Sequence, residues 1–154
     1  MENFQFFSRI SDLNKKDQDL IYSAQKASES SYSPYSRYRV GAAVRLTDDQ
    51  VIHGSNQENA SYPAGLCAER VALFHIGSSY PNKKIESLAT VAKRAGESDF
   101  KPVSPCGVCR QVMLEFELRQ KTPIRVILQA NDGRWVIAQN AQVMLPFSFG
   151  QDSL

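Results

Sequence analysis

The chain has 154 residues, of which 42% are hydrophobic and 22% charged, and its formal net charge is +2. This length and composition are those of one globular domain with its own core. No apolar run is long enough to cross a bilayer, and residues 1–12 lack the charged-then-apolar design of a signal peptide. We therefore expect no membrane contact and a reducing, cytoplasmic location. So small a net charge gives no support for nucleic-acid binding.

Hydrophobic periodicity predicts helices that alternate with strands. Residues 1–14 carry no motif and are expected to form an N-terminal arm, loosely held or packed on a neighbour, ahead of a single domain over residues 15–154. The expected helices, the first capped by Asn14, span residues 15–30, 67–79, 106–119 and 141–145. The expected strands span residues 39–46, 51–56, 85–95, 124–130 and 135–138. The pattern predicts an α/β fold in which helices cover a five-stranded mixed sheet.

Two short stretches, residues 66–70 (LCAER) and 104–110 (SPCGVCR), hold all three cysteines of the chain. A catalytic zinc ion takes three protein ligands and keeps its fourth tetrahedral position for water, so Cys67, Cys106 and Cys109 suffice. Cys106 and Cys109 are three residues apart and face the same way at a helix start. Helix N-termini favour negative charge and so assist thiol deprotonation. Both helices are expected to begin at the same end of neighbouring strands, where the three thiolates meet.

Glu69 and Arg70 follow the first cysteine directly. Glu69 is two positions from Cys67 and does not share its side of the helix, so its carboxylate is better placed to reach a water on the metal than the metal itself. Arg70, three positions from Cys67, does share that side. Because zinc with three thiolates carries one net negative charge, a guanidinium beside the ligand would offset it.

Other interpretations of the cysteines are weaker. A lone C-x-x-C is equally typical of a redox pair or of half a structural zinc site. A structural site needs a fourth ligand, and the sequence has no fourth cysteine. His75 would lie about 12 Å along the helix from Cys67, which is too far. His53 falls in a strand-like run, and a redox pair leaves Cys67 and Glu69 unexplained.

In these motifs the sequence resembles the cytidine deaminases of the small, homotetrameric, three-cysteine zinc type. The matching segments are residues 35–43 (YSRYRVGAA), 56–62 (NQENASY), 67–70 (CAER), 104–112 (SPCGVCRQV) and 145–149 (LPFSF). The resemblance implies the three-layer α-β-α fold of that family and a catalytic domain over residues 15–154. It also implies one zinc ion per chain and self-association into a homotetramer.

The resemblance also implies the reaction, which is hydrolytic deamination of cytidine and 2′-deoxycytidine in pyrimidine salvage. A bound zinc ion lowers the pKa of its water toward about 7. Glu69 would take the water's proton, deliver one to ring N3, and then carry one to the amino group that leaves as ammonia. The products would be uridine or 2′-deoxyuridine and ammonia.

Substrate contacts follow from the same resemblance. An amide and a carboxylate can bind ribose hydroxyls together, and the resemblance gives this role to Asn56 and Glu58. Tyr38 stands where the family usually carries Phe, which packs against the pyrimidine ring. The ring face survives the replacement, but the added hydroxyl must find a partner.

Three further contacts are implied by the resemblance alone. The backbone N–H of Ala68 would meet the pyrimidine O2, and the carbonyl of Ser104 would meet the leaving amine. Phe149, near the C-terminus, would reach into the active site of an adjacent subunit.

Three alternatives stay open at this point. A deaminase of the blasticidin type shares the C-A-E and S-P-C-G-x-C motifs, although Asn56 and Glu58 favour a nucleoside. A polynucleotide deaminase needs a basic, aromatic-lined channel, for which a net charge of +2 gives little support. A zinc-stabilised interaction module predicts a closed, four-ligand metal site and has no need for Glu69.

Overall fold

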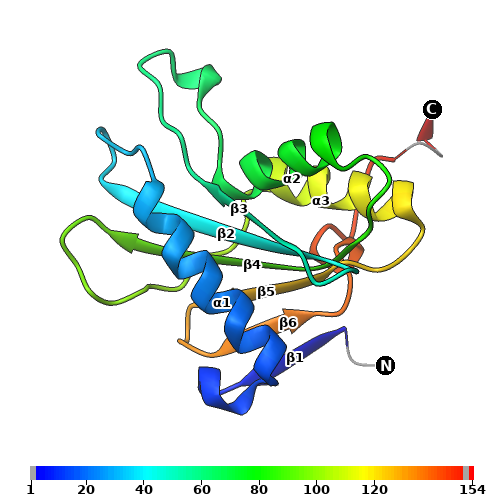
Figure 1. Cartoon of the computed structure of the whole chain (residues 1–154), viewed down its shortest axis with the longest axis horizontal. Helices are drawn as coiled ribbons and strands as arrows, with labels where there is room; N and C mark the ends of the chain where they lie inside the picture. Colours follow the sequence, from blue (N-terminus) through cyan, green and yellow to red (C-terminus); the bar gives the residue numbers. More distant parts are fainter. Residues whose placement is uncertain (1–2, 151–152) are drawn as a thin grey trace.

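A computed structural model describes residues 3–150 and 153–154 and shows one six-stranded sheet with helices on both faces (Figure 1). The strands are β1 (Phe4–Phe7), β2 (Tyr38–Leu46), β3 (Val51–Ser55), β4 (Ile85–Arg94), β5 (Arg125–Gln129) and β6 (Trp135–Ala138). The α-helices are α1 (Lys15–Ala27), α2 (Ala68–Ser79) and α3 (Gly107–Gln120). Short 3-10 turns span Ile10–Asp12, Ser28–Ser30, Tyr62–Ala64 and Gln142–Met144. The predicted element order is confirmed from residue 15 onward, the last predicted helix being one of these 3-10 turns.

The sheet has the strand order β1-β6-β5-β4-β2-β3. Only β4 and β5 pair in parallel, and the other neighbours pair antiparallel, so the sheet is mixed as predicted. The predicted number of five strands is wrong, because the arm supplies a sixth. Phe4 and Phe7 of β1 pack against the core clusters on opposite faces of the sheet, which ties this short segment to the edge of β6. Residues 1–2 of the predicted arm lie outside the described residues.

The domain has three layers. Figure 1 shows α1 crossing one face of the sheet, with α2 and α3 on the other. Each face has its own core cluster: Ala43 of β2 packs in the cluster with α1, and its neighbour Val44 packs with α2 and α3. Because successive strand residues point to opposite faces, burial on both sides explains the continuous apolar runs of β2 and β4. In the described part of the chain, no helix is both long and apolar enough to span a membrane.

The first helix begins where the sequence predicts. The side-chain oxygen of Asn14 accepts a hydrogen bond from the Asp17 backbone N–H at 2.9 Å, which satisfies one of the free donors of the first turn. Asp17 is itself buried, and its carboxylate accepts hydrogen bonds from both terminal nitrogens of Arg125, at 3.0 and 2.7 Å. This ion pair fastens the start of α1 to strand β5.

The sheet topology brings the two cysteine motifs together. Strands β3 and β4 both run antiparallel to β2, so they run in the same direction. Helix α2 follows β3 and helix α3 follows β4, and both begin at the same end of the sheet, as predicted. The two strands are not neighbours, however, because β2 lies between them. The separation suits two helices lying side by side, since helix axes need about twice the spacing of strands.

Candidate active site

Cys67 ends the segment that leads into α2. Its backbone is extended, with φ −71° and ψ 154°, and it occupies the N-cap position, so the helix proper starts at Ala68. Its side chain makes no capping hydrogen bond and is therefore free to turn toward α3. The unpaired N–H groups of the first helical turn lie beside the sulfur and favour its thiolate form.

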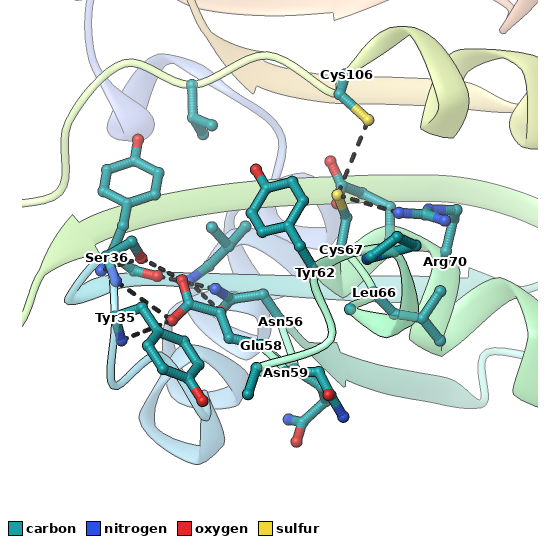
Figure 2. A pocket seen from close by; sticks show the side chains of 18 of the residues that line it. Tyr35, Ser36, Asn56, Glu58, Asn59, Tyr62, Leu66, Cys67, Arg70 and Cys106 are labelled. Carbon is teal, nitrogen blue, oxygen red and sulfur yellow. Dashed lines mark hydrogen bonds between the residues drawn. The ribbon is translucent and has the colours of Figure 1, made fainter.

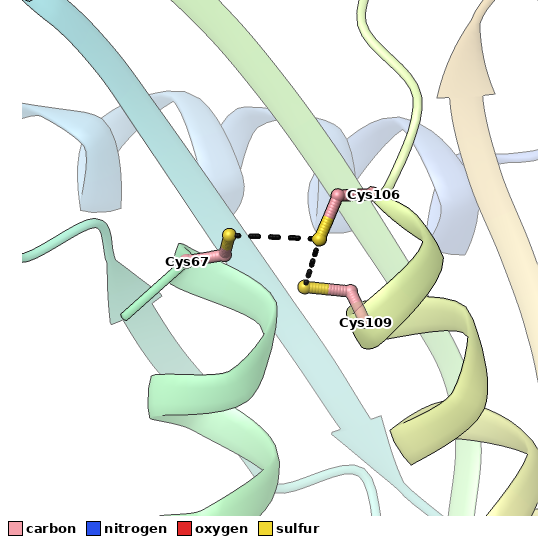
Figure 3. Close-up of side chains that lie close together, drawn as sticks. All are labelled: Cys67, Cys106 and Cys109. Carbon is pink, nitrogen blue, oxygen red and sulfur yellow. Dashed lines mark hydrogen bonds between the residues drawn. The ribbon is translucent and has the colours of Figure 1, made fainter. Parts of the chain in front are cut away.

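Cys106 and Cys109 lie at the start of α3. Cys106 is the N-cap residue, and Cys109 follows in the first turn, where it is buried. The Arg110 side chain donates from Nε to the Pro105 carbonyl at 2.8 Å, which fixes the segment that enters the helix. As Figure 3 shows, the two cysteines of α3 face Cys67 across the gap between the helix starts.

The three sulfurs form one group. Cys67 Sγ lies 3.8 Å from Cys106 Sγ, Cys106 Sγ lies 3.5 Å from Cys109 Sγ, and all three are within 4.8 Å of one another. Two sulfurs bound at about 2.3 Å to a tetrahedral zinc ion are about 3.8 Å apart. All three cysteines are free, so each can offer a thiolate. The donor set therefore fits one zinc ion per chain.

Arg70 places a positive charge beside this group. Its Nη2 lies 3.6 Å from the Cys67 sulfur (Figure 2). The neighbouring Cys109 thiol, followed by Arg70 and Cys106, lowers the pKa of Cys67 to about 5, against the opposing effect of burial. The interaction with Cys67 and burial raise the pKa of Cys109. These interactions favour the thiolate form of Cys67.

Glu69 lies in the first turn of α2 and is only 3% exposed. Burial raises the pKa of its carboxyl. The group that could bind a metal contains the three sulfurs and, among the described residues, no carboxylate. Glu69 nevertheless lines the same cavity as Cys67 and Cys106, so it faces the space next to the metal site.

A cavity of about 1000 Å³ opens over the sulfurs. Its inner end is formed by Cys67, Glu69, Arg70 and Cys106. The rest of its wall comes from the turn before β2, the start of β2, the end of β4 and the segments that follow β3 and β4: Tyr35, Ser36, Tyr38, Val40, Asn56, Gln57, Glu58, Asn59, Ala60, Tyr62, Pro63, Gly65, Leu66, Arg94, Val103 and Ser104. The cavity is large enough for a nucleoside, and its inner end presents a buried carboxylate beside three sulfurs.

Asn56 follows β3, and its side chain is hydrogen-bonded to the start of β2. Its side-chain oxygen accepts hydrogen bonds from the Val40 N–H, at 2.8 Å, and from the Ser31 hydroxyl. Its amide nitrogen donates to the Tyr38 carbonyl at 2.8 Å. The amide therefore retains one N–H for a ligand and little capacity to accept.

Glu58 is held by the turn before β2. The Glu58 carboxylate accepts from the backbone N–H groups of Tyr35, at 2.9 Å, and Ser36, at 3.3 Å, and from the Ser36 hydroxyl (Figure 2). These bonds, the Ser36 hydroxyl foremost, lower the pKa of the carboxyl. Sequence reasoning missed Ser36, although its place in the matched segment of residues 35–43 was a usable signal.

Tyr38 lines the cavity at the start of β2, opposite Arg94 of β4 in the sheet register. Burial raises the pKa of the Tyr38 hydroxyl, and the positive charge of Arg94 opposes that shift. Arg94 was also missed, because the apolar run of β4 predicted burial for its neighbours and gave no sign that its end reaches the cavity.

The remaining predicted site residues lie in different places. Ser104 lines the cavity, and Ala68 is buried at the first position of α2, where its N–H has no partner within the helix. Phe149 does not line the cavity of its own chain. The residue is 58% exposed, and its carbonyl accepts a hydrogen bond from the Gln111 side chain at 2.8 Å.

The fold and this site together define a zinc-dependent deaminase. The chain matches the sequence profile of the cytidine and deoxycytidylate deaminase zinc-binding region over residues 14–123. It is 48% identical over 99 residues to the cytidine deaminase of Halalkalibacterium halodurans, covering 64% of this chain and 70% of that protein. With the cytidine deaminase of Mycobacterium tuberculosis it shares 34% identity over 134 residues, covering 85% and 87%.

A solved structure agrees with these sequence matches. The crystal structure of cytidine deaminase from Burkholderia pseudomallei superposes with a TM-score of 0.70 at 36% identity, covering 89% of this chain and all of that one. The chain therefore belongs to the cytidine and deoxycytidylate deaminase family.

Proposed function

We propose that this chain is a zinc-dependent hydrolase that converts cytidine and water to uridine and ammonia. We propose 2′-deoxycytidine as a second substrate and pyrimidine salvage as the setting. The observation that carries the proposal is the buried Glu69 beside three sulfurs at the inner end of a nucleoside-sized cavity. Similarity to proteins described as cytidine deaminases supports the choice of substrate.

Zinc, held by Cys67, Cys106 and Cys109, would supply a water that is acidic enough to act as a nucleophile near neutral pH. Glu69 accepts the proton that this water loses and delivers a proton to ring N3, which makes C4 electrophilic. Once the C–O bond to C4 has formed, Glu69 takes the remaining proton of that oxygen and carries it to the 4-amino group. The C4–N bond then breaks, and ammonia leaves.

The environment of Glu69 suits this proton transfer. A carboxyl group whose pKa is raised by burial holds a proton more readily than an exposed one, which suits a group that accepts a proton and then returns it. The negative charge of Cys67 also raises the pKa of Glu69, and the Arg70 guanidinium lies beside that sulfur.

Substrate contacts are assigned as follows. Asn56 donates its remaining amide hydrogen to a ribose hydroxyl, and Glu58 accepts from one, its carboxylate being held in place before substrate arrives. The ring of Tyr38 packs on the pyrimidine. The N–H of Ala68 donates to O2, and the carbonyl of Ser104 accepts from the leaving amine.

We further propose that the chain acts in the cytoplasm as a homotetramer, and that Phe149 completes the cavity of an adjacent subunit. The exposure of its ring outside its own cavity supports this assignment. The assignment predicts complementation: a Phe149→Ala chain and a Glu69→Gln chain, each nearly inactive alone, regain activity when co-assembled. Mixtures that form hetero-oligomers without regaining activity would contradict it.

The function is tested by ultraviolet absorbance of the zinc-loaded protein mixed separately with cytidine, cytosine, CMP and blasticidin S. Conversion of cytidine that is lost on chelation is the expected result. Conversion of another compound alone would overturn the substrate assignment. Silence on the whole panel from a folded, zinc-loaded protein would overturn the enzyme assignment and favour a zinc-stabilised interaction module.

A further inference from the structure

Strand β4 carries a buried threonine between the core and the cavity. Residues at alternate positions of a strand share a face. Leu88 packs in the cluster with α2 and α3, and Arg94 lines the cavity, so Thr90, between them in the same alternation, faces the α2 layer. Its side chain is 0% exposed.

The sheet register places Thr90 under the start of α2. Thr90 pairs with Ala42 of β2, and Ala42 pairs with Gly54 of β3, so the three residues form one row across the sheet. A Cβ atom at Gly54 would lie 2.2 Å from the Ala68 carbonyl oxygen and 2.8 Å from the Ala72 nitrogen. The backbone of α2 can therefore lie close to the sheet at this row, because Gly54 has no side chain and Ala42 has only a methyl group. Glu69 lies in the helical turn that rests on this row.

Thr90 and Glu69 are both buried polar residues, and Thr90 lies in the row of the sheet under the helical turn that carries Glu69. The Thr90 hydroxyl is buried and has no hydrogen-bond partner among the described residues. A buried hydroxyl left without a partner is costly, and a buried carboxylate is the acceptor it needs.

We propose that Thr90 is a positioning residue for the reaction. Its hydroxyl donates to one oxygen of the Glu69 carboxylate and turns the other oxygen toward the cavity. Thr90 itself touches neither substrate nor metal. The inference rests on the proposed role of Glu69 and adds a residue of strand β4, outside both cysteine motifs.

The test compares Thr90→Val, which keeps the shape and removes the hydroxyl, with Thr90→Ser, which keeps the hydroxyl. Ser87→Ala serves as the control, because it removes a buried hydroxyl on the opposite face of the same strand. For each variant, zinc content, Tm, kcat and KM for cytidine are measured. We expect Thr90→Val to lower kcat about tenfold with KM and zinc content unchanged, and Thr90→Ser to restore kcat to within about twofold of the parent.

A second readout does not depend on turnover. Unfolding of the metal-free protein by urea is measured for Thr90→Val, Glu69→Gln and the double variant. A hydrogen bond between the two side chains predicts that the effects of the single changes are not additive. Additive effects, or a Thr90→Val enzyme with parental kcat, would overturn the proposal. An equal loss of kcat in Thr90→Val and Thr90→Ser would also overturn it by showing a packing effect. Failure of the proposed function would instead appear as a parent protein inactive on cytidine, with the stability coupling still measurable.

Discussion

The guanidinium of Arg70 lies 3.6 Å from the sulfur of Cys67, close enough to donate a hydrogen bond to a thiolate. Without the guanidinium, the negative charge of the three thiolates is less well compensated. Arg70→Gln is therefore expected to weaken zinc affinity about tenfold. The measurement is competition with a chromophoric chelator. Arg119→Gln, an exposed arginine on α3, is the control and is expected to keep parental affinity. Equal affinities for all three proteins would contradict the prediction.

Glu69→Gln is expected to retain zinc and lower kcat for cytidine about 1000-fold. The amide keeps the shape of the carboxyl but cannot carry a proton between the water and the ring. Single-turnover absorbance and metal analysis on the same preparation give both quantities. Substantial turnover by the zinc-loaded variant would refute the role given to Glu69.

Ser36→Ala is expected to raise KM for cytidine about fivefold with little change in kcat. The Ser36 hydroxyl holds the Glu58 carboxylate before substrate binds, and a looser carboxylate binds a ribose hydroxyl less well. Steady-state kinetics on cytidine provide the check, with Ser33→Ala in the same turn as control. A change confined to kcat would show that Ser36 acts on the chemistry and not on ribose binding.

Tyr38→Phe is expected to keep kcat/KM within about twofold, whereas Tyr38→Ala loses about tenfold or more. The ring supplies the apolar surface for the pyrimidine, and the hydroxyl lies on the side of Arg94. Steady-state kinetics on cytidine give kcat/KM for both variants, and their ratio shows whether the ring or the hydroxyl of Tyr38 matters for activity. A large loss in Tyr38→Phe would show that the hydroxyl contacts substrate.

Glu117→Ala is expected to lower the free energy of unfolding by about 3 kcal/mol. The buried Glu117 carboxylate accepts from the N–H groups of Ile124 and Ala141, both at 2.7 Å, and Gln142, at 3.2 Å, so its loss leaves buried donors unpaired. Urea unfolding of the metal-loaded protein measures the change. Glu115→Ala on the exposed side of α3 is the control, and similar losses in both would contradict this account.

The metal ligands could be predicted from sequence because their evidence is local. Cys106 and Cys109 are one helical turn apart, and Cys67 precedes a carboxylate at a fixed spacing. The capping role of Asn14 is equally local and is confirmed. Strand β1 could not be predicted, because four residues with two half-buried aromatics gain strand character only from the edge of β6.

Contacts between distant segments were also out of reach. Ser36 meets Glu58 across 22 positions, and Arg94 reaches the cavity only because β4 pairs with the start of β2. Glu117 looks like any solvent-facing glutamate of a helix until β5 and the last 3-10 turn fold against it. Each of these depends on tertiary register, which no spacing within a motif encodes.

The pairing of β1 with β6 has a practical consequence for handling this protein. With residues 4–7 in place, the hydrogen-bonding groups of β6 are occupied by the chain itself, and Gln139 extends the pairing by donating to the Asn3 carbonyl at 3.1 Å. A truncation that starts after residue 7 would leave β6, with Trp135, Val136 and Ile137, as an exposed edge strand. Its unpaired backbone N–H and C=O groups could then pair with a strand of another chain. Shortened versions are therefore expected to aggregate on expression even though every residue of the zinc site is retained.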